Sequence, residues 1–177
     1  MRLFFGFDLE PGDKAAIADW RDRHAAASGR PVPPANFHIT LAFLGDLDTR
    51  VLEHLCDKMD ALCTDLPSKP LVIKLDRVGY WPSPRIYWLG TSADCDAIKN
   101  TARKLQFMGQ AFGSRRERLS FTPHITLYRG CERPPPAPLT MPLITLALRE
   151  VVLFESKQGR SAVSYTPLAA WPLTGNP

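Results

Sequence analysis

The spacing of apolar and polar residues changes several times along the chain, between a strand-like and a helix-like period. Runs rich in β-branched and aromatic residues predict strands at 2–9, 37–44, 71–80, 85–91, 121–128, 143–154 and 162–168. Apolar residues at helical spacing predict helices from Pro11 to about Ser28, from Asp48, and from about Asp94. The pattern therefore predicts a chain in which strands and helices alternate.

Proline and glycine mark the connections between these segments. The sequence Trp81-Pro82-Ser83-Pro84 predicts a hairpin between 71–80 and 85–91, and the prolines of 134–138 predict a stiff loop. Gly29 is expected to stop the first helix. Gly159 is expected to form the turn that joins the two closing strands, 143–154 and 162–168.

One tetrapeptide, His-Ile-Thr-Leu, occurs twice, at 38–41 and at 124–127, in a chain with four histidines. On a strand, residues i and i+2 point to the same face, so each copy presents an imidazole and a hydroxyl together. Each copy also follows a predicted helix at a similar distance and is preceded by proline. These parallels indicate an ancient duplication, with the two motif strands related by an approximate two-fold axis.

The composition is that of a soluble globular protein, and it identifies no further functional residues. The chain has 177 residues, 45% hydrophobic and 23% charged, which is typical of one soluble domain or of two lobes sharing a core. A net charge of +4 permits an anionic partner such as RNA but does not require one. Neither a signal peptide nor a membrane helix is indicated, and no CxxC pair occurs, so a cytoplasmic protein with reduced cysteines is expected.

The paired motif suits a reaction at phosphorus. An imidazole has a reference pKa near 6.5, so one histidine can accept a proton from water while the other gives one to the leaving oxygen. The hydroxyls of Thr40 and Thr126 can donate hydrogen bonds to the non-bridging oxygens. A zinc site is a weaker alternative, because threonine is not a usual ligand and no HExxH occurs. No G-x-S-x-G supports a serine hydrolase.

The chain resembles the two-histidine phosphoesterase superfamily, and within it the RNA 2′,3′-cyclic phosphodiesterases once named 2′-5′ RNA ligases. The segments that carry the resemblance lie in the family's order at 2–9, 32–45, 123–127, 159–160 and 165–168. The resemblance implies a single bilobal, duplicated α+β domain over 1–177, with flanking helices and two antiparallel sheets around a central cleft that carries the two HxTx motifs. It also implies metal-independent hydrolysis of RNA 2′,3′-cyclic phosphate ends to 2′-phosphates, with no cofactor.

The same resemblance implies roles for individual residues. His38 would be the proton donor, His124 the proton acceptor, and Arg129 a contact to phosphate. Strand parity places Arg129 on the opposite face from His124 unless the strand ends or bulges first, whereas Tyr128 would share the face of His124 and could stack on a base. Phe43 has core-face parity and is expected to pack.

Several alternatives remain open from the sequence. The partner is expected to be an RNA with a 2′,3′-cyclic phosphate or a 2′-5′ linkage; tRNA halves and a reversible ligation follow only from the family's older name. A relative acting on a small cyclic nucleotide, or a non-catalytic RNA-binding module, would carry similar motifs. The basic residues at 115–118 would either gather RNA phosphates or form a solvated loop. A monomer without membrane or metal partners is expected.

Overall fold

The structure, a computed structural model, describes residues 1–114, 121–159 and 163–173. The basic residues at 115–118 and the first residue of the predicted strand 162–168 therefore lie outside the described residues. In chain order the elements are β1 (Arg2–Asp8), α1 (Pro11–His24), β2 (Arg30–Pro31), β3 (His38–Asp46), α2 (Leu52–Leu62), β4 (Leu71–Leu75), β5 (Arg77–Trp81), β6 (Ile86–Gly90), α3 (Asp96–Gln110), β7 (His124–Arg129), β8 (Ile144–Leu148), β9 (Glu150–Gln158) and β10 (Val163–Pro172), with three short 3₁₀ turns at Pro34–Asn36, Thr49–Val51 and Cys63–Asp65.

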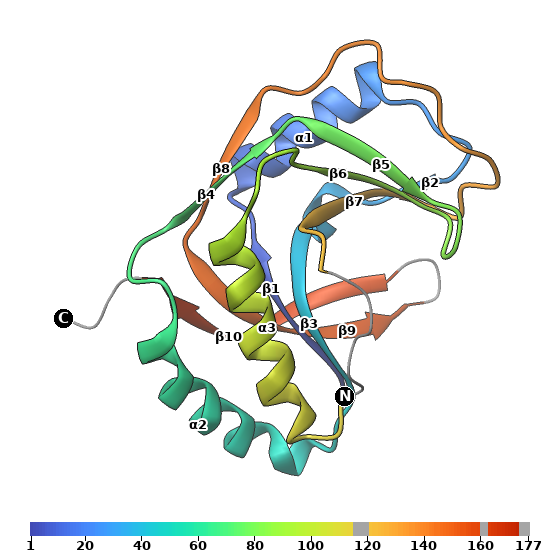
Figure 1. The fold of residues 1–177 in the computed structure, drawn as a ribbon. Helices are drawn as coiled ribbons and strands as arrows, with labels where there is room; N and C mark the ends of the chain where they lie inside the picture. Colours follow the sequence, from blue (N-terminus) through green and yellow to red (C-terminus); the bar gives the residue numbers. More distant parts are fainter. Residues whose placement is uncertain (115–120, 160–162, 174–177) are drawn as a thin grey trace.

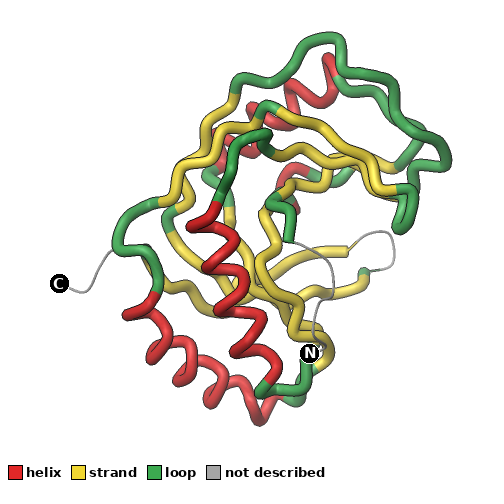
Figure 2. Tube along the Cα trace, in the orientation of Figure 1, coloured by secondary structure: helices red, strands yellow, loops and turns green. Residues whose placement is uncertain are grey.

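Two four-stranded antiparallel sheets form the body of the molecule (Figure 1 and Figure 2). Sheet A has the strand order β10-β9-β1-β3, and sheet B has the order β2-β7-β6-β5. Sheet A therefore combines the first and the last strands of the chain, while sheet B is built mainly from its middle. The predicted α+β class with two antiparallel sheets is confirmed. A separate two-stranded sheet, β4-β8, was not predicted.

Two predicted strands are each divided into two. The segment predicted as one strand at 71–80 breaks at Asp76, so that β4 pairs with β8 and only β5 forms the predicted hairpin with β6. Asp76 stabilises this break, because its carboxylate accepts hydrogen bonds from the backbone N–H and the hydroxyl of Ser92. The segment predicted at 143–154 likewise breaks at Arg149, whose carbonyl accepts from the N–H of Leu173.

The first helix is shorter than predicted, and Gly29 has a different role. α1 ends at His24 rather than near Ser28. A Cβ on Gly29 would lie 2.6 Å from the carbonyl oxygen of Arg129 and 2.7 Å from the sulfur of Cys131. The glycine therefore permits the chain beside β2 to approach the end of β7, rather than stopping the helix.

Helices cover the outer faces of the sheets. α2 and α3 lie against sheet A, where the indole N–H of Trp171 on β10 donates to Asp60 on α2 at 2.5 Å. α1 lies against sheet B, where Arg21 donates to the carbonyl of Val32 at 2.5 Å. Most buried hydrophobic side chains form one cluster that includes residues of both sheets, and Phe4, Val152 and Phe154 form a second, smaller one. No helix among the described residues is long and apolar enough to cross a membrane.

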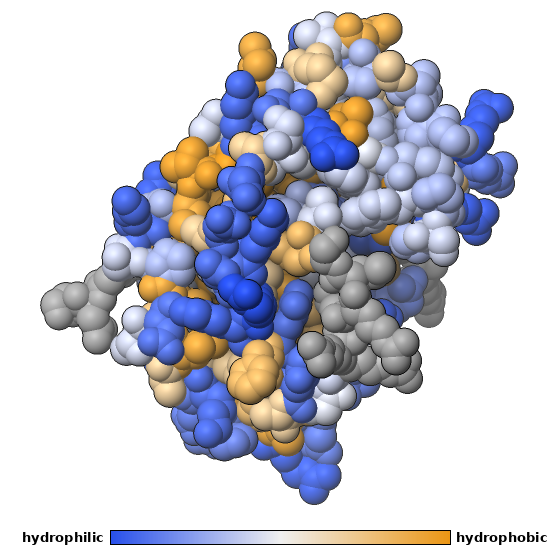
Figure 3. All heavy atoms as spheres, in the orientation of Figure 1, coloured by the Kyte–Doolittle hydropathy of each residue, from blue (hydrophilic) through white to orange (hydrophobic). Residues whose placement is uncertain are grey.

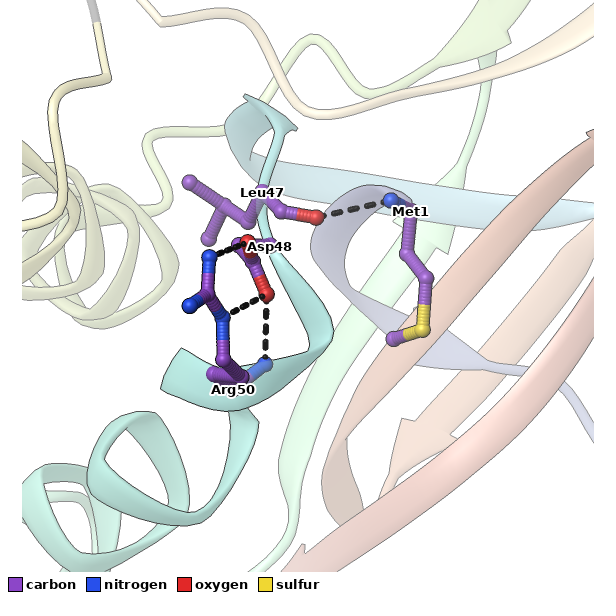
Figure 4. A network of polar contacts seen from close by, with 4 residues as sticks. All are labelled: Met1, Leu47, Asp48 and Arg50. Atoms are coloured by element: carbon purple, nitrogen blue, oxygen red, sulfur yellow. Dashed lines mark hydrogen bonds and ion pairs between the residues drawn. The ribbon is translucent and has the colours of Figure 1, made fainter.

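The start of the second helix follows the sequence prediction. The side chain of Asp48 accepts a hydrogen bond from the backbone N–H of Arg50 at 2.9 Å, at the start of the 3₁₀ turn that leads into α2 (Figure 4). The guanidinium of Arg50 also contacts this carboxylate, and the amino group of Met1 donates to the carbonyl of Leu47 at 2.7 Å. These contacts tie the amino terminus to the entry of the helix.

Candidate active site

The two His-Ile-Thr-Leu motifs begin neighbouring elements of the fold. His38 is the first residue of β3 and His124 is the first residue of β7, and these two strands contact each other. In each motif the isoleucine and leucine are buried, whereas the histidine and threonine remain partly accessible. We call the sheet faces that carry these histidines and threonines the site faces. The structure therefore brings together the two motif pairs that the sequence predicted would act together.

Both motif strands bulge at the same position. In sheet A, β1 pairs Gly6 with Thr40 and Phe5 with Ala42, so that Leu41 has no opposite residue. In sheet B, β6 pairs Trp88 with Thr126 and Tyr87 with Tyr128, so that Leu127 has none. An extra residue in a strand reverses the alternation of faces beyond it. Side-chain parity counted from the histidines therefore fails after the leucine of each motif.

The bulges overturn two sequence predictions. Tyr128 does not share the face of His124: it is 8% exposed, and its ring stacks on Tyr87 in the core. The prediction that Phe43 packs in the core is also wrong, because its side chain is 59% exposed. Arg129 occupies the position in β7 that Phe43 occupies in β3, and the bulge returns it to the site face beside the histidines. Its charge contributes to lowering the pKa of both His38 and His124.

Each histidine is held by a backbone carbonyl two residues before it. The Nδ1 of His38 lies 2.7 Å from the carbonyl oxygen of Asn36, and the Nδ1 of His124 lies 2.8 Å from that of Thr122. A carbonyl only accepts, so Nδ1 carries the hydrogen in both rings. In the neutral imidazole, Nε2 is then the free base, and in the imidazolium it becomes the donor. Nε2 is thus the atom of each ring that can exchange a proton with a ligand.

In the first motif, the histidine also contacts the threonine of the same motif. The Nε2 of His38 lies 2.9 Å from the hydroxyl oxygen of Thr40. With the proton of His38 on Nδ1, the hydroxyl donates to Nε2 in the neutral site. A phosphate oxygen near this position can take the hydrogen bond from the threonine while the imidazolium donates its own. The pair is therefore arranged as two donors toward one anion.

Aromatic side chains that the sequence did not single out surround His38. Its ring centroid lies 4.8 Å from that of Tyr165, edge-on at 78°, and 4.9 Å from that of Phe4. Phe154 lies at 5.9 Å. These residues come from β10, β1 and β9, which are far apart in the chain, so no local pattern indicated that they meet at the histidine. They exclude water from one side of the imidazole.

The environment of His124 repeats this arrangement with other residues. Trp81 lies edge-on to it at a centroid distance of 4.6 Å and an interplanar angle of 79°, and Trp88 lies at 6.2 Å. Trp88 covers the backbone of Gly79, where a Cβ would lie 2.0 Å from the indole ring. The glycine is therefore required for the indole to take its place against β5. Both histidines have an aromatic edge on one side and a further aromatic ring nearby.

Burial and positive charge shape the electrostatics of the site. Burial lowers the pKa of His38 from 6.5 to about 4, assisted by the charges of Arg129 and His124. The pKa of His124 is lowered as well, again chiefly by burial and also by Arg129. The free site therefore holds two neutral imidazoles near an arginine at neutral pH. A bound anion would offset the positive field and favour protonation of one ring.

Two pockets lie near the motifs: one is lined by His38, and the other reaches the residues that precede His124. A pocket of about 210 Å³ is lined by His38 together with Asp8, Lys14, Phe154 and Tyr165. A larger one, of about 690 Å³, begins at Thr122 and Pro123, immediately before His124, and extends toward α3.

Comparisons with known proteins agree with this geometry. The sequence profile of the LigT-like phosphoesterases matches residues 9–88. The RNA 2′,3′-cyclic phosphodiesterase of Escherichia coli K12 is 32% identical over 174 residues, covering 98% of this chain and 97% of that protein. The enzyme of the same name from Methanocaldococcus jannaschii is 31% identical, covering 73% of this chain and 71% of its own.

Solved structures show the same fold. The crystal structure of E. coli LigT complexed with 3′-AMP has a TM-score of 0.83 at 32% identity, covering 98% of both chains. A protein of Thermus thermophilus has a TM-score of 0.81 at 25% identity, covering 99% of both chains. Sequence similarity over nearly the full length and the shared fold lead to one conclusion. The chain belongs to the LigT-like phosphoesterase family.

Proposed function

We propose that this phosphoesterase hydrolyses the 2′,3′-cyclic phosphate at the end of an RNA to a 2′-phosphate. The observation that carries the proposal is the pair of imidazoles on contacting strands, each held through Nδ1 so that Nε2 is the atom available for proton transfer. Relatives of 31–32% identity are named RNA 2′,3′-cyclic phosphodiesterases, which supports the same substrate class.

The two histidines would divide the proton transfers between them. Nε2 of His124 takes a proton from a water molecule while the oxygen of that water attacks phosphorus. The bond from phosphorus to the 3′ oxygen breaks on the opposite side, and the 3′ oxygen takes the proton from Nε2 of His38. One water is consumed, and the phosphate remains on the 2′ oxygen. Substrate binding raises the pKa of His38 toward the value that an acid needs, because the phosphate anion offsets the charge of Arg129.

The threonines and Arg129 would stabilise the charge on phosphorus. The hydroxyls of Thr40 and Thr126 share the site faces with the histidines and can donate to the non-bridging oxygens. Arg129, returned to the site face by the bulge at Leu127, supplies a guanidinium toward the same oxygens. Tyr128 has no part in this proposal, because its ring lies in the core.

This scheme routes each proton through a side chain and needs no metal or cofactor. We further propose that the protein acts as a monomer in the cytoplasm, on RNA ends such as those of cleaved tRNA. In a reversible ligation a 5′-hydroxyl would take the place of water: its oxygen attacks the 2′,3′-cyclic phosphate and loses its proton to His124, the bond to the 3′ oxygen breaks, and the 3′ oxygen takes a proton from His38. The products are a 2′-5′ linkage and a free 3′-hydroxyl. These finer assignments follow the family resemblance of the motifs.

The substrate test compares two cyclic phosphates in the presence of EDTA. The protein is incubated with a short RNA that ends in a 2′,3′-cyclic phosphate, and separately with a mononucleotide 2′,3′-cyclic phosphate. We expect conversion of the RNA to a 2′-phosphate, distinguished from the 3′-phosphate by chromatography against both standards. A 3′-phosphate product would contradict the assigned leaving group. Turnover of the mononucleotide alone would replace RNA by a small cyclic nucleotide as the substrate.

A further inference from the structure

The pocket of about 690 Å³ that reaches Thr122 and Pro123 is not used by the proposed chemistry. One wall consists of Thr122 and Pro123, the residues that lead into the second motif. The opposite wall is the exposed face of α3, which includes Asn100, Arg103 and Gln106. α3 lies at the front of the molecule in Figure 1, and the surface over it is largely hydrophilic (Figure 3). The pocket is thus a polar depression whose lining reaches the residue next to His124 but does not include His124 itself.

Strand register connects this pocket to His124. On the site face of sheet B, His124 pairs with Gly90, and Gly90 pairs with Arg77. Directly paired residues of an antiparallel sheet point to the same face, so Arg77 lies in the same row as the catalytic histidine. Gly90 between them has no side chain, and Pro123 packs against its backbone. The indole of Trp88 fills the space over Gly90, where a Cβ would lie 2.9 Å from the ring, and it lies between Arg77 and His124: Arg77 is over this ring, and the ring centroid is 6.2 Å from that of His124.

α3 is also connected to the first motif. The side-chain amide of Gln106 donates to the carbonyl of Leu41, the bulged residue of β3, at 3.0 Å. The helix wall of the pocket is therefore tied to the first motif strand.

The pocket is lined by three cationic side chains, Arg77, Lys99 and Arg103, and by two carboxylates, Asp94 and Asp96. Lys99 is paired with Asp94 at 2.6 Å. Arg77 and Arg103 form no ion pair with any residue that the structure describes; Arg77 lies over the ring of Trp88, and Arg103 donates to the side chain of Asn100. Both arginines are exposed and line the same pocket. Two exposed guanidiniums near a phosphoesterase site can bind the phosphates of an extended anionic chain.

We propose that this pocket binds the RNA strand next to the cyclic end, with Arg77 and Arg103 each contacting a backbone phosphate. The inference rests on the proposed function, since it assumes an RNA substrate. It adds a specificity determinant: the terminal cyclic phosphate reacts between the histidines, while the adjoining nucleotides bind along α3. A mononucleotide cannot reach these contacts, so oligonucleotides should be preferred.

The test compares kcat/KM for a mononucleotide and a pentanucleotide, both ending in a 2′,3′-cyclic phosphate. The variants are Arg77→Gln and Arg103→Gln. Lys58→Gln serves as the control, because it removes the same charge from an exposed position on α2. Arg103→Lys tests whether a point charge suffices. Circular dichroism and thermal unfolding check that each variant is folded, and the salt dependence is measured for each enzyme.

For Arg77→Gln and Arg103→Gln we expect kcat/KM for the pentanucleotide to fall about 5- to 10-fold, with the mononucleotide unchanged. Each variant should also reduce the slope of log kcat/KM against log salt by ~0.7, the value for one lost phosphate contact on a single strand. Equal losses on both substrates, or pentanucleotide turnover equal to that of Lys58→Gln, would overturn the pocket assignment. If the wild-type protein hydrolyses neither substrate, the proposed function itself fails, which is a separate outcome.

Discussion

The side chains of the two motifs are fixed in the same way. Each histidine donates its Nδ1 hydrogen to the carbonyl of the residue two positions before it. This contact selects one tautomer and leaves Nε2 as the reactive atom. Because both rings are constrained identically, we attribute the proposed difference between acid and base to their surroundings. His38 is the more strongly perturbed, with its pKa lowered to about 4.

The threonines should act through their hydroxyls. We expect Thr40→Ala and Thr126→Ala each to lower kcat by ~10²-fold, as for loss of one donor to a developing negative charge. Thr40→Ser and Thr126→Ser keep the hydroxyl and should retain most of the activity. Steady-state rates on the cyclic RNA measure both pairs. If the alanine variants match the serine variants, the hydroxyls have no part in the reaction.

The pH dependence should reflect both lowered pKa values. One histidine must be neutral and the other protonated, so kcat/KM should follow a bell-shaped curve. Because burial lowers the pKa of both groups below 6.5 in the free protein, we expect the maximum on the acid side of pH 6.5. The measurement is kcat/KM between about pH 3.5 and about pH 8.5, a range that spans both limbs of such a curve. A plateau that extends to the alkaline end would show that neither lowered pKa controls the reaction.

At the scale of single residues, the sequence predicted the site residues that belong to the repeated motif. It did not predict the aromatic residues that surround them. The duplicated motif identified His38, Thr40, His124 and Thr126 because one tetrapeptide occurs twice in similar strands. The aromatic neighbours Phe4, Phe154 and Tyr165 come from three strands that meet only in the folded sheet. Their position depends on strand pairing, which residue spacing within one segment does not encode.

At the scale of elements, the bulges at Leu41 and Leu127 decide which residues face the site. Simple alternation placed Arg129 away from His124 and Tyr128 beside it, and the structure reverses both. A bulge has no reliable sequence signature, because it depends on the partner strand. The same limit applies to the breaks at Asp76 and Arg149, where continuous apolar segments change from one sheet to another. Long periodic helices such as α3 were predicted more closely.

Arg129 tests the consequence of the bulge in β7. We expect Arg129→Gln to lower kcat/KM by about 10- to 100-fold, the equivalent of ~1.5–3 kcal/mol for a hydrogen bond to a charged group. The loss should be equal for the mononucleotide and the pentanucleotide, because the contact is to the reacting phosphate. Arg133→Gln, an exposed position beyond the strand, is the control. A loss confined to the pentanucleotide would place Arg129 on the RNA body instead.

Gly79 tests the packing of the aromatic wall at His124. A Cβ at this position would lie 2.0 Å from the ring of Trp88, so Gly79→Ala must displace the indole. We expect it to destabilise the protein by about 1–3 kcal/mol and to lower activity. Gly12→Ala is the matched control: nothing lies within 4 Å of its added Cβ, and alanine in α1 should be neutral or stabilising. Urea unfolding compares the two. Equal stability would show that the wall tolerates displacement of Trp88.

At the scale of the whole molecule, the fold is an approximate duplication in which one of the two sheets contains strands from both ends of the chain. Sheet A takes β1 and β3 from the beginning and β9 and β10 from the end, and sheet B takes β5, β6 and β7 from the middle. Each sheet contributes one histidine, one threonine and one residue beyond the bulge, Phe43 or Arg129. In the proposed mechanism the two sheets present related sets of side chains to one phosphate, and the two histidines differ in their surroundings.

The measurement that tests the account most directly is hydrolysis of a cyclic-phosphate RNA in EDTA by the wild type, His38→Ala and His124→Ala. Circular dichroism and thermal unfolding establish first that both variants are folded. The account predicts turnover by the wild type and a loss of at least ~10²-fold in each variant, since each ring transfers one of the two protons. Full activity in either folded variant, or a wild type that is inactive without added metal, would contradict the paired-histidine mechanism.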